Sequence, residues 1–250
     1  MFLIIRIFSR IRVHFFFYVV TFIMLFTGHF RDYFICFVLL LFHEFGHLCG
    51  AFFFKWKVLK IVLLPFGGLI IFDNLINTSL FEEFIVTLLG PVFQVVLFLV
   101  LNYCFNLSND VVYYNFLLLF FNLLPIFPLD GSKLFSVFLY LIFPFYFGHI
   151  IMIVVSVICL LLLFCFNGFN VMYDFLLVFL FVRVITEAIN HKFFLFKFLF
   201  ERYSYSLNFK KVKYVRGVQF MFKSCKHFIL SDKKYVDEKN YLLKMFDKSG

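Results

Sequence analysis

The sequence predicts an all-α polytopic membrane protein with about six transmembrane helices, a re-entrant loop and a small cytoplasmic α+β tail. Of its 250 residues, 64% are hydrophobic and only 15% are charged, and the mean hydropathy is +1.01. A soluble domain carries about 25% charged residues, because much of its surface faces water. The chain also contains several apolar runs near the length of about 20 residues that crosses a bilayer as a helix. Both observations argue against a soluble enzyme, a nucleic-acid-binding module and a disordered regulator.

The apolar runs are separated by charged or turn-forming residues, which set the approximate limits of each predicted span. The spans lie roughly at residues 13–27, 33–54, 84–101, 111–128 continuing toward 142, 148–166 and 171–189. The first run follows three arginines, as in a signal peptide, but a small-residue cleavage site does not follow it. We therefore predict an uncleaved first helix.

The distribution of lysine and arginine predicts the orientation in the membrane, because these residues collect in cytoplasmic loops. They precede the first predicted span and follow the second, the fourth and the sixth, at Arg6, Arg10, Arg12, Lys55, Lys57, Lys60, Lys133 and the tail. Residues 191–250 alone contain 14 Lys and Arg against 5 Asp and Glu. Both termini are therefore expected in the cytoplasm. The basic tail is interpreted as a positive-inside segment beside anionic lipid, and no nucleic-acid partner is expected.

Residues 58–72 are apolar but short, and Pro65, Gly67 and Gly68 interrupt them. This segment predicts a re-entrant or interfacial hairpin. Irregular backbone at membrane depth needs protein or water to satisfy its hydrogen bonds, so the loop is expected to line a cavity. A short hydrophobic connector is the alternative.

The second predicted span contains His43-Glu44-Phe45-Gly46-His47, an HExxH motif. On a helix, residues four apart lie on one face, so both imidazoles can bind one Zn²⁺ while Glu44 stands beside the metal and can deprotonate a water molecule there. A carboxylate at membrane depth is costly unless a partner or water compensates it. This cost favours a zinc site with Glu44 as general base over a polar cluster that only joins helices through hydrogen bonds.

A third metal ligand must come from another part of the chain, because catalytic zinc usually has three protein ligands. The polar residues of the apolar runs that could supply it are Asp130, Asp174, Glu187, His149, Gln94 and Asn122. Asp130 is favoured because Pro125 and Pro128 interrupt the helix before it, and unwound backbone creates a polar, hydrated pocket near a membrane boundary. By the predicted topology, His47 and Asp130 both approach the cytoplasmic side.

Two motifs occur together in the chain: HEFGH at residues 43–47 and NLLPIFPLDG at residues 122–131. With these two motifs, the chain resembles the site-2 protease family of intramembrane zinc metalloproteases. The segment LPFGG at residues 64–68 is similar to the family's membrane re-entrant segment, and LGPVFQ at residues 89–94 is similar to its Gly-Pro-containing third span. The resemblance covers about residues 1–190 and implies an intramembrane metalloprotease domain there.

The resemblance implies one Zn²⁺ per chain, no other cofactor, and a site of four residues: His43, His47 and Asp130 as ligands and Glu44 as general base. Asn122 matches the family's motif asparagine, which implies a role in orienting the substrate or polarising its carbonyl. A helix–helix hydrogen bond is the alternative for Asn122. Phe66 and Gly67 of the 58–72 loop are expected to bind or orient the substrate as well.

A short chain with six spans, cytoplasmic termini and a cytoplasmic tail resembles the sporulation branch of this family. That branch carries a C-terminal nucleotide-sensing CBS domain, and residues 225–246 are similar to the end of one, a strand followed by an amphipathic helix. Residues 210–250 are too few for a complete CBS domain. We therefore predict a shortened CBS-like tail, preceded by a basic juxtamembrane linker at residues 191–209, and assign no nucleotide to it.

The predicted function is regulated intramembrane proteolysis of a membrane-associated protein, with the active site near the cytoplasmic side. For the sporulation branch, the resemblance implies that the substrate is a membrane-tethered sigma-factor proform and that membrane-bound partners inhibit the protease. A housekeeping site-2 protease that cleaves an anti-sigma factor or a signal-peptide remnant is the nearest alternative. A non-enzymatic metal transporter, in which the same side chains line an ion path, is the third. The sequence indicates no oligomeric state.

Overall fold

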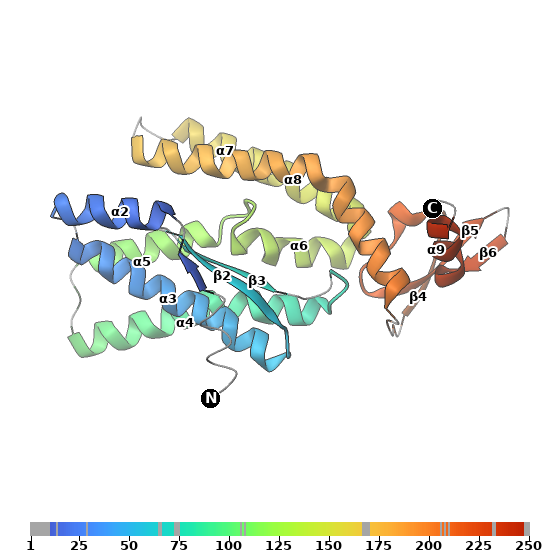
Figure 1. The fold of residues 1–250 in the computed structure, drawn as a ribbon, viewed down its shortest axis with the longest axis horizontal. Coiled ribbons are helices and arrows are strands. Elements are labelled where there is room, and N and C mark those ends of the chain that lie inside the picture. Colours follow the sequence, from blue (N-terminus) through green and yellow to red (C-terminus); the bar gives the residue numbers. More distant parts are fainter. Residues whose placement is uncertain are drawn as a thin grey trace. The chain divides into compact units, whose positions relative to one another are not determined.

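The structure is a computed structural model that describes residues 11–13, 15–28, 30–64, 67–72, 76–105, 107, 109–166, 171–205, 207, 209, 211–231 and 234–247. These residues form helices and two small sheets (Figure 1). The chain divides into two compact units. The first contains residues 1–74 and 85–123, and the second contains residues 75–84 and 124–250.

The first unit combines apolar helices with a three-stranded sheet. Its helices are α2 (Phe15–Phe26), α3 (Phe30–Phe53), most of α4 (Leu80–Phe105) and α5 (Asn109–Asn122). Its strands are β1 (Ile11–Val13), β2 (Val58–Leu64) and β3 (Gly67–Phe72), in the order β1-β2-β3. Helix α3 packs against α2, α5 and β3, so it has the most central place in this unit.

Among the residues that the structure describes, three helices are long and apolar enough to cross a membrane, within Tyr33–Phe53, Leu80–Phe105 and Phe145–Cys165. Helices α2 and α5 are apolar but shorter. Large apolar side chains such as Phe22, Val96 and Phe164 remain more than half exposed on these helices, as expected of surfaces that face lipid. An integral membrane protein follows from this arrangement, and the predicted total of six spans stays a prediction.

Within the 58–72 segment, residues 58–64 and 67–72 form paired strands. Strand β2 runs antiparallel to β3, with Val58 opposite Phe72 and Leu64 opposite Gly67, and β1 pairs parallel to β2. Pro65 and Phe66 lie outside the described residues, and Gly67 is the first residue of β3. The pairing agrees with a hairpin, and its predicted re-entry into the membrane stays a prediction.

The predicted fourth span, a run from 111 to 128 that continued toward 142, is two helices in the structure. Helix α5 ends at Asn122 and a separate helix, α6, covers Asp130–Ile142, so the predicted interruption before Asp130 is confirmed. Pro125 and Pro128 lie between them, and the Phe127–Pro128 peptide bond is cis. Proline lacks the N–H that a helix needs and clashes with the preceding turn, so the helix stops before this loop. As a result Asp130 becomes the first residue of α6.

In the second unit, α6 packs against α7 (Phe145–Phe166), and α7 packs along α8 (Val171–Ser204) (Figure 1). Phe145 of α7 and Phe198 of α8 are nearly inaccessible to solvent, and their rings stack with centroids 4.3 Å apart. Helix α8 continues past the predicted end of the sixth span, so residues 191–204 of the predicted linker are helical.

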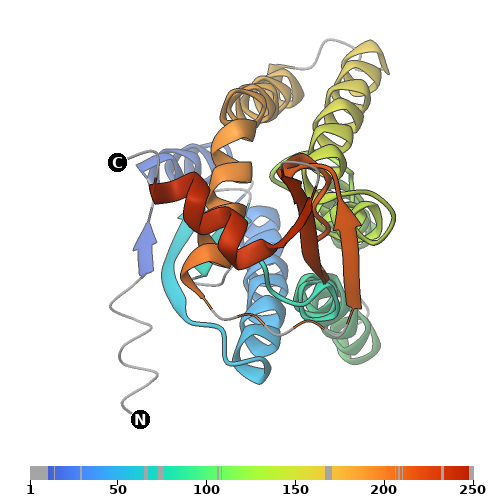
Figure 2. The ribbon, with the colours of Figure 1, turned by 90° about the vertical axis from the view of Figure 1, so that its right-hand side faces the viewer.

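The C-terminal tail forms a small α+β layer on the same unit. Strands β4 (Lys211–Val215), β5 (Cys225–Ser231) and β6 (Lys234–Asp237) pair in the order β4-β5-β6, with a 3-10 turn η1 (Val218–Phe220) after β4. Helix α9 (Glu238–Asp247) crosses one face of this sheet (Figure 2). Alternate residues of β5 are buried beneath it, and Ile229 and Leu242 are fully buried.

Candidate metal centre

The HExxH motif lies in the second half of α3, where helical spacing brings its two histidines to one face. His43 and His47 are 1% and 6% exposed, while Phe42 and Phe45 on the other faces are 42% and 52% exposed. Glu44 is half-buried beside the first histidine. The predicted helical placement of the motif is therefore confirmed, and the imidazoles point into protein rather than outward.

The two imidazoles approach each other through the same ring nitrogen. The Nε2 atoms of His43 and His47 are 3.1 Å apart, and the ring planes are inclined by 80°. Each Nδ1 atom contacts an oxygen that can only accept a hydrogen bond. Nδ1 of His43 lies 3.0 Å from Oε1 of Gln94, and Nδ1 of His47 lies 2.9 Å from the carbonyl oxygen of Val86.

These contacts fix which nitrogen carries the proton. Because both Nδ1 atoms face acceptors, a neutral imidazole at either position has an unprotonated Nε2 atom, which is the form that binds a metal ion. The two Nε2 atoms are 3.1 Å apart in a buried site, so both can reach one cation. Two nitrogens bound to one tetrahedral zinc ion at about 2.0–2.1 Å are about 3.3–3.4 Å apart. The histidine pair therefore fits zinc in both donor chemistry and spacing.

Helix α4 comes very close to this histidine pair. A Cβ atom placed on Gly90 would lie 2.3 Å from Cε1 and 2.4 Å from Nε2 of His47. One on Gly46 of α3 would lie 2.3 Å from the backbone oxygen of Leu89. Small residues are what allow two helix backbones to approach this closely. Gly90 thus leaves room for the imidazoles at the position where a side chain would fill the metal site.

Asp130 begins α6, where a negative charge is favourable at the helix N-terminus. It is 7% exposed, and its Oδ1 accepts a hydrogen bond from Nζ of Lys133 at 3.0 Å. The loop before it is tied to α7: the backbone N–H of Phe127 donates to Oγ of Ser156 at 3.2 Å, and that hydroxyl lies 3.2 Å from the carbonyl oxygen of Pro125. Asp130 is therefore a buried carboxylate on a braced loop.

Three buried side chains are suited to hold a metal ion, each with one ligand atom: His43, His47 and Asp130. They are the three ligands that the sequence predicted. Among the other candidates, Asn122 is half-buried at the C-terminal end of α5. His149 lies near Glu187, with Nε2 and Oε1 3.5 Å apart. The side chain of Asp174 lies outside the described part of the chain, as does Phe66.

Sequence reasoning missed the role of three residues around the histidines. Gln94 was a candidate third ligand, but in the structure its amide oxygen accepts from the far side of the His43 ring. Asn115 contacts Gln94, and Gly90 faces His47. The sequence gives only weak indications of these roles. Gln94 and Asn115 are amides within apolar runs, and Gly90 belongs to a Gly-Pro pair.

The tail holds a separate buried polar cluster around Arg202 of α8. Its guanidinium donates to Oδ1 of Asn77 at 2.7 Å, to Oε1 of Glu238 at 2.9 Å and to three backbone carbonyls of the tail. His227 is fully buried, its Nε2 accepts from the backbone N–H of Phe222, and its Nδ1 contacts Glu238. Burial lowers the pKa of His227 below its usual value. This cluster ties the tail to the segment before α4.

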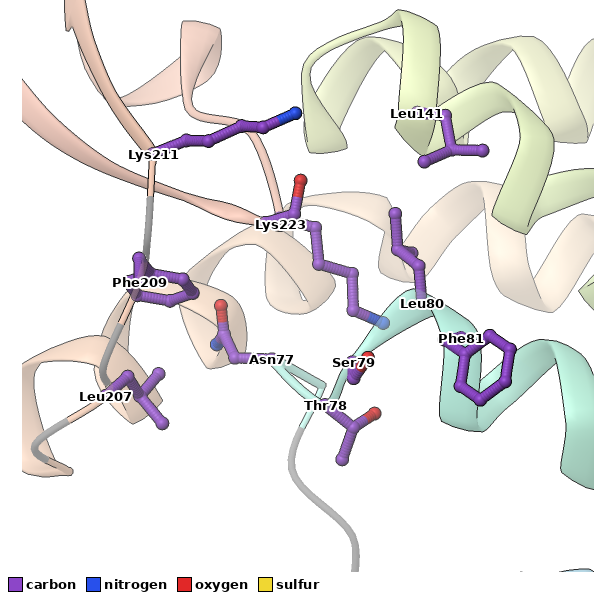
Figure 3. A pocket seen from close by; sticks show the side chains of 11 residues that line it. Asn77, Thr78, Ser79, Leu80, Phe81, Leu141, Leu207, Phe209, Lys211 and Lys223 are labelled. Atoms are coloured by element: carbon purple, nitrogen blue, oxygen red, sulfur yellow. The ribbon is translucent and has the colours of Figure 1, made fainter.

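A cavity of about 450 Å³ lies beside this cluster, between residues 77–81 and the tail (Figure 3). Lys223 extends from the tail toward Ser79 at the start of α4 and forms an ion pair with Glu83. Burial lowers the pKa of Lys223, and the nearby charge of Glu83 opposes this shift. Since Glu83 already engages this ammonium group, we assign the lysine to packing between the tail and α4.

Comparison with known proteins agrees with the site and the fold. The family model described as Peptidase family M50 matches residues 33–110, which include the HExxH motif. Stage IV sporulation protein FB of Bacillus subtilis (strain 168) is 34% identical over 212 residues, covering 78% of this chain and 71% of that protein. The solved site-2 protease from Methanocaldococcus jannaschii has a similar fold, with a TM-score of 0.56 and 22% identity over 71% of this chain and 90% of that chain.

The membrane helices and the buried HExxH pair define a membrane-embedded metalloprotease. The chain belongs to peptidase family M50, the family of the site-2 proteases. It is a zinc metalloprotease and an integral membrane protein, and the expected resemblance is confirmed.

Proposed function

We propose that this protein is an intramembrane zinc endopeptidase that cleaves a membrane-associated protein, with His43, His47 and Asp130 as metal ligands and Glu44 as general base. The observation that carries the proposal is the pair of Nε2 lone pairs 3.1 Å apart, each fixed by a hydrogen bond at Nδ1. Family membership and the buried Asp130 support it. In this proposal the loop that begins α6 brings Asp130 to the histidine pair.

Bound zinc supplies a water molecule acidic enough to attack a peptide near neutral pH and polarises the scissile carbonyl. Glu44 follows His43 directly in the sequence, so its carboxylate stands beside the ligand pair and accepts the proton of the attacking water. The same carboxyl group then donates that proton to the leaving amine. The Nδ1 contacts with Gln94 and Val86 hold the His43 and His47 rings in place, so that their Nε2 atoms face the proposed metal position.

The substrate must present an extended backbone, because the carbonyl groups of a helix are already hydrogen-bonded. We assign Asn122, Phe66 and Gly67 to binding or orienting this segment. Gly67 starts β3, which pairs with β2 as an antiparallel neighbour. The proposed orientation puts both termini and the active site toward the cytoplasm, on the basis of the positive-inside distribution of Lys and Arg.

For the substrate we propose a membrane-tethered sigma-factor proform processed during sporulation, with membrane-bound inhibitory partners. Support comes from the 34% identity to a protein named for stage IV of sporulation. In this scheme residues 1–190 form the protease domain, and a shortened CBS-like cytoplasmic tail follows the 191–209 linker. A housekeeping role on an anti-sigma factor or a signal-peptide remnant predicts cleavage in cells that do not sporulate.

The first test is co-expression of the protein with a membrane-tethered sigma proform, using wild type and Glu44→Gln. The glutamine retains the size of Glu44 but cannot accept the proton, so we expect zinc to remain bound while cleavage is lost. Cleavage by both proteins would overturn the role of Glu44. Zinc flux into proteoliposomes without any proteolysis would favour a transporter instead.

The second test addresses the third ligand. Asp130→Asn removes the charge and should weaken zinc binding by at least about tenfold, because one of three ligands is lost. Asp247→Asn, at an exposed position in the last turn of α9, is the matched control and should bind zinc like wild type. Equal zinc affinity in Asp130→Asn and wild type would remove Asp130 from the proposed ligand set.

A further inference from the structure

The Nδ1 atoms of the two histidines contact two different kinds of acceptor, a backbone carbonyl and a side-chain amide. His47 donates to the backbone carbonyl of Val86, which every amino acid at that position would provide. His43 instead donates to the side-chain oxygen of Gln94, 51 residues away on α4. The orientation of the first histidine therefore depends on the identity of a side chain that is neither a proposed metal ligand nor the proposed general base.

Gln94 is itself held by a second side chain. Its Nε2 group donates to the backbone oxygen of Asn115 at 3.2 Å and to Oδ1 of the same residue at 3.1 Å. Both partners are acceptors, so the nitrogen of the Gln94 amide must face α5 and the oxygen must face His43. Gln94 is 0% and Asn115 1% exposed. A hydrogen-bonded path thus runs from α5 through α4 to the imidazole on α3.

If these hydrogen bonds only joined helices, it would not matter which group donates and which accepts. Here each donor and acceptor is aligned toward one result, which is a proton on Nδ1 of His43 and a lone pair on Nε2. A ligating histidine usually donates its other N–H to a carboxylate, carbonyl or water. Losing that partner costs about 10–100-fold in metal affinity or activity. An uncharged amide suits this site because a second buried carboxylate would be expensive at membrane depth.

We propose that Gln94 and Asn115 are positioning residues that fix the tautomer and ring orientation of His43 and thereby set the affinity of the site for its metal. The inference rests on the proposed zinc site, and it adds two residues that touch neither metal nor substrate. Gln94 acts on His43 directly, and Asn115 acts by preventing the Gln94 amide from rotating.

The test measures Zn²⁺ affinity of the full-length protein in detergent, by competition with a chelator, for Gln94→Met and Gln94→Glu. Methionine matches glutamine in length but cannot replace its oxygen acceptor, so Zn²⁺ should bind about 10–100-fold more weakly. Glutamate keeps an oxygen toward Nδ1 of His43. The Zn²⁺ affinity of this variant should therefore stay within about tenfold of wild type and exceed that of the methionine variant. If Gln94 served only to join helices, glutamate would be the more harmful change, because it puts acceptors against both oxygens of Asn115.

Asn115→Asp provides the second arm, since it retains the Oδ1 acceptor, whereas Asn115→Leu removes it. We expect the aspartate variant to bind Zn²⁺ more tightly than the leucine variant. Thr87→Val is the matched control, because Thr87 is another buried polar residue of α4, and its affinity should equal that of wild type. The d–d absorption of bound Co²⁺ reports whether the coordination changes when Gln94 is replaced.

The outcomes separate this inference from the proposed function. Wild type that binds no Zn²⁺ would remove the metal site and the inference together. Wild type that binds Zn²⁺ with Gln94→Met binding equally well would overturn only the positioning role. Weaker Zn²⁺ binding by Gln94→Glu than by Gln94→Met would assign Gln94 to helix packing.

Discussion

Gly90→Ala is the smallest change that the structure predicts to disable the metal site. The added methyl group would lie 2.3 Å from Cε1 and 2.4 Å from Nε2 of His47, and 3.0 Å from Nε2 of His43. Real Cβ atoms essentially never approach a heavy atom closer than 3.0 Å. Either the His47 ring or the backbone of α4 must therefore move, and a shift of α4 would also carry away the carbonyl oxygen of Val86 that orients His47.

The size of the effect follows from the overlap. To relieve the contact from 2.3 Å to 3.0 Å, the ring must retreat by about 0.7 Å, whereas metal–ligand distances hold to within about 0.2 Å. We expect the loss of His47 as a good ligand to weaken zinc binding by at least about 100-fold, which is about 2.8 kcal/mol. Alanine is a better helix former than glycine by about 1 kcal/mol, so helix propensity acts in the opposite direction.

The assay is Zn²⁺ affinity by chelator competition, together with cleavage of a membrane-tethered substrate. Gly217→Ala is the matched control, because the same methyl group there meets nothing within 4 Å and the backbone φ of −172° suits any residue. It should leave both readouts unchanged. The reasoning would be refuted if Gly90→Ala bound Zn²⁺ within about threefold of wild type, since the overlap worked out above predicts at least about 100-fold.

Three further changes test the surroundings of the site. Ser156→Ala removes the hydroxyl that accepts from the N–H of Phe127, so we expect about 1–3 kcal/mol of local destabilisation. An added protease should then cut the proline loop faster, and an unchanged rate of this cutting would contradict a bracing role. Arg202→Lys cannot reproduce the forked contacts of a guanidinium that is 1% exposed and should destabilise the tail by about 3 kcal/mol or more, measured by hydrogen exchange of the tail amides. Because burial lowers the pKa of His227 in the folded tail, the unfolded tail binds more protons, so tail stability is complete above the usual value of 6.5 and falls as pH decreases through it. The measurement is the protection factor of the tail amides, which removes the intrinsic pH dependence of exchange. Protection factors that stayed constant from pH 8 to pH 5, about the range over which an ordinary histidine titrates, would contradict this expectation.

The ligand motif could be located from the sequence because its geometry is local. A four-residue spacing places His43 and His47 on one face of any helix, and the apolar run around them predicts the helix. The interruption before Asp130 was also encoded locally, by Pro125 and Pro128. Its exact form, with a separate α6 that starts at Asp130, depends on the loop being held by α7.

The environment of the motif could not be predicted, because it depends on how helices far apart in the sequence pack together. Gln94 contacts a histidine 51 residues away and Asn115 follows 21 residues later, and no local periodicity links the three. By itself the sequence determined a membrane protein with a helical HExxH site, since composition and helical repeat act over short stretches of chain. Only the tertiary structure decided that Gly90 leaves room for the imidazoles and that Gln94 sets the proton on His43, because these depend on the close approach of α4 to α3.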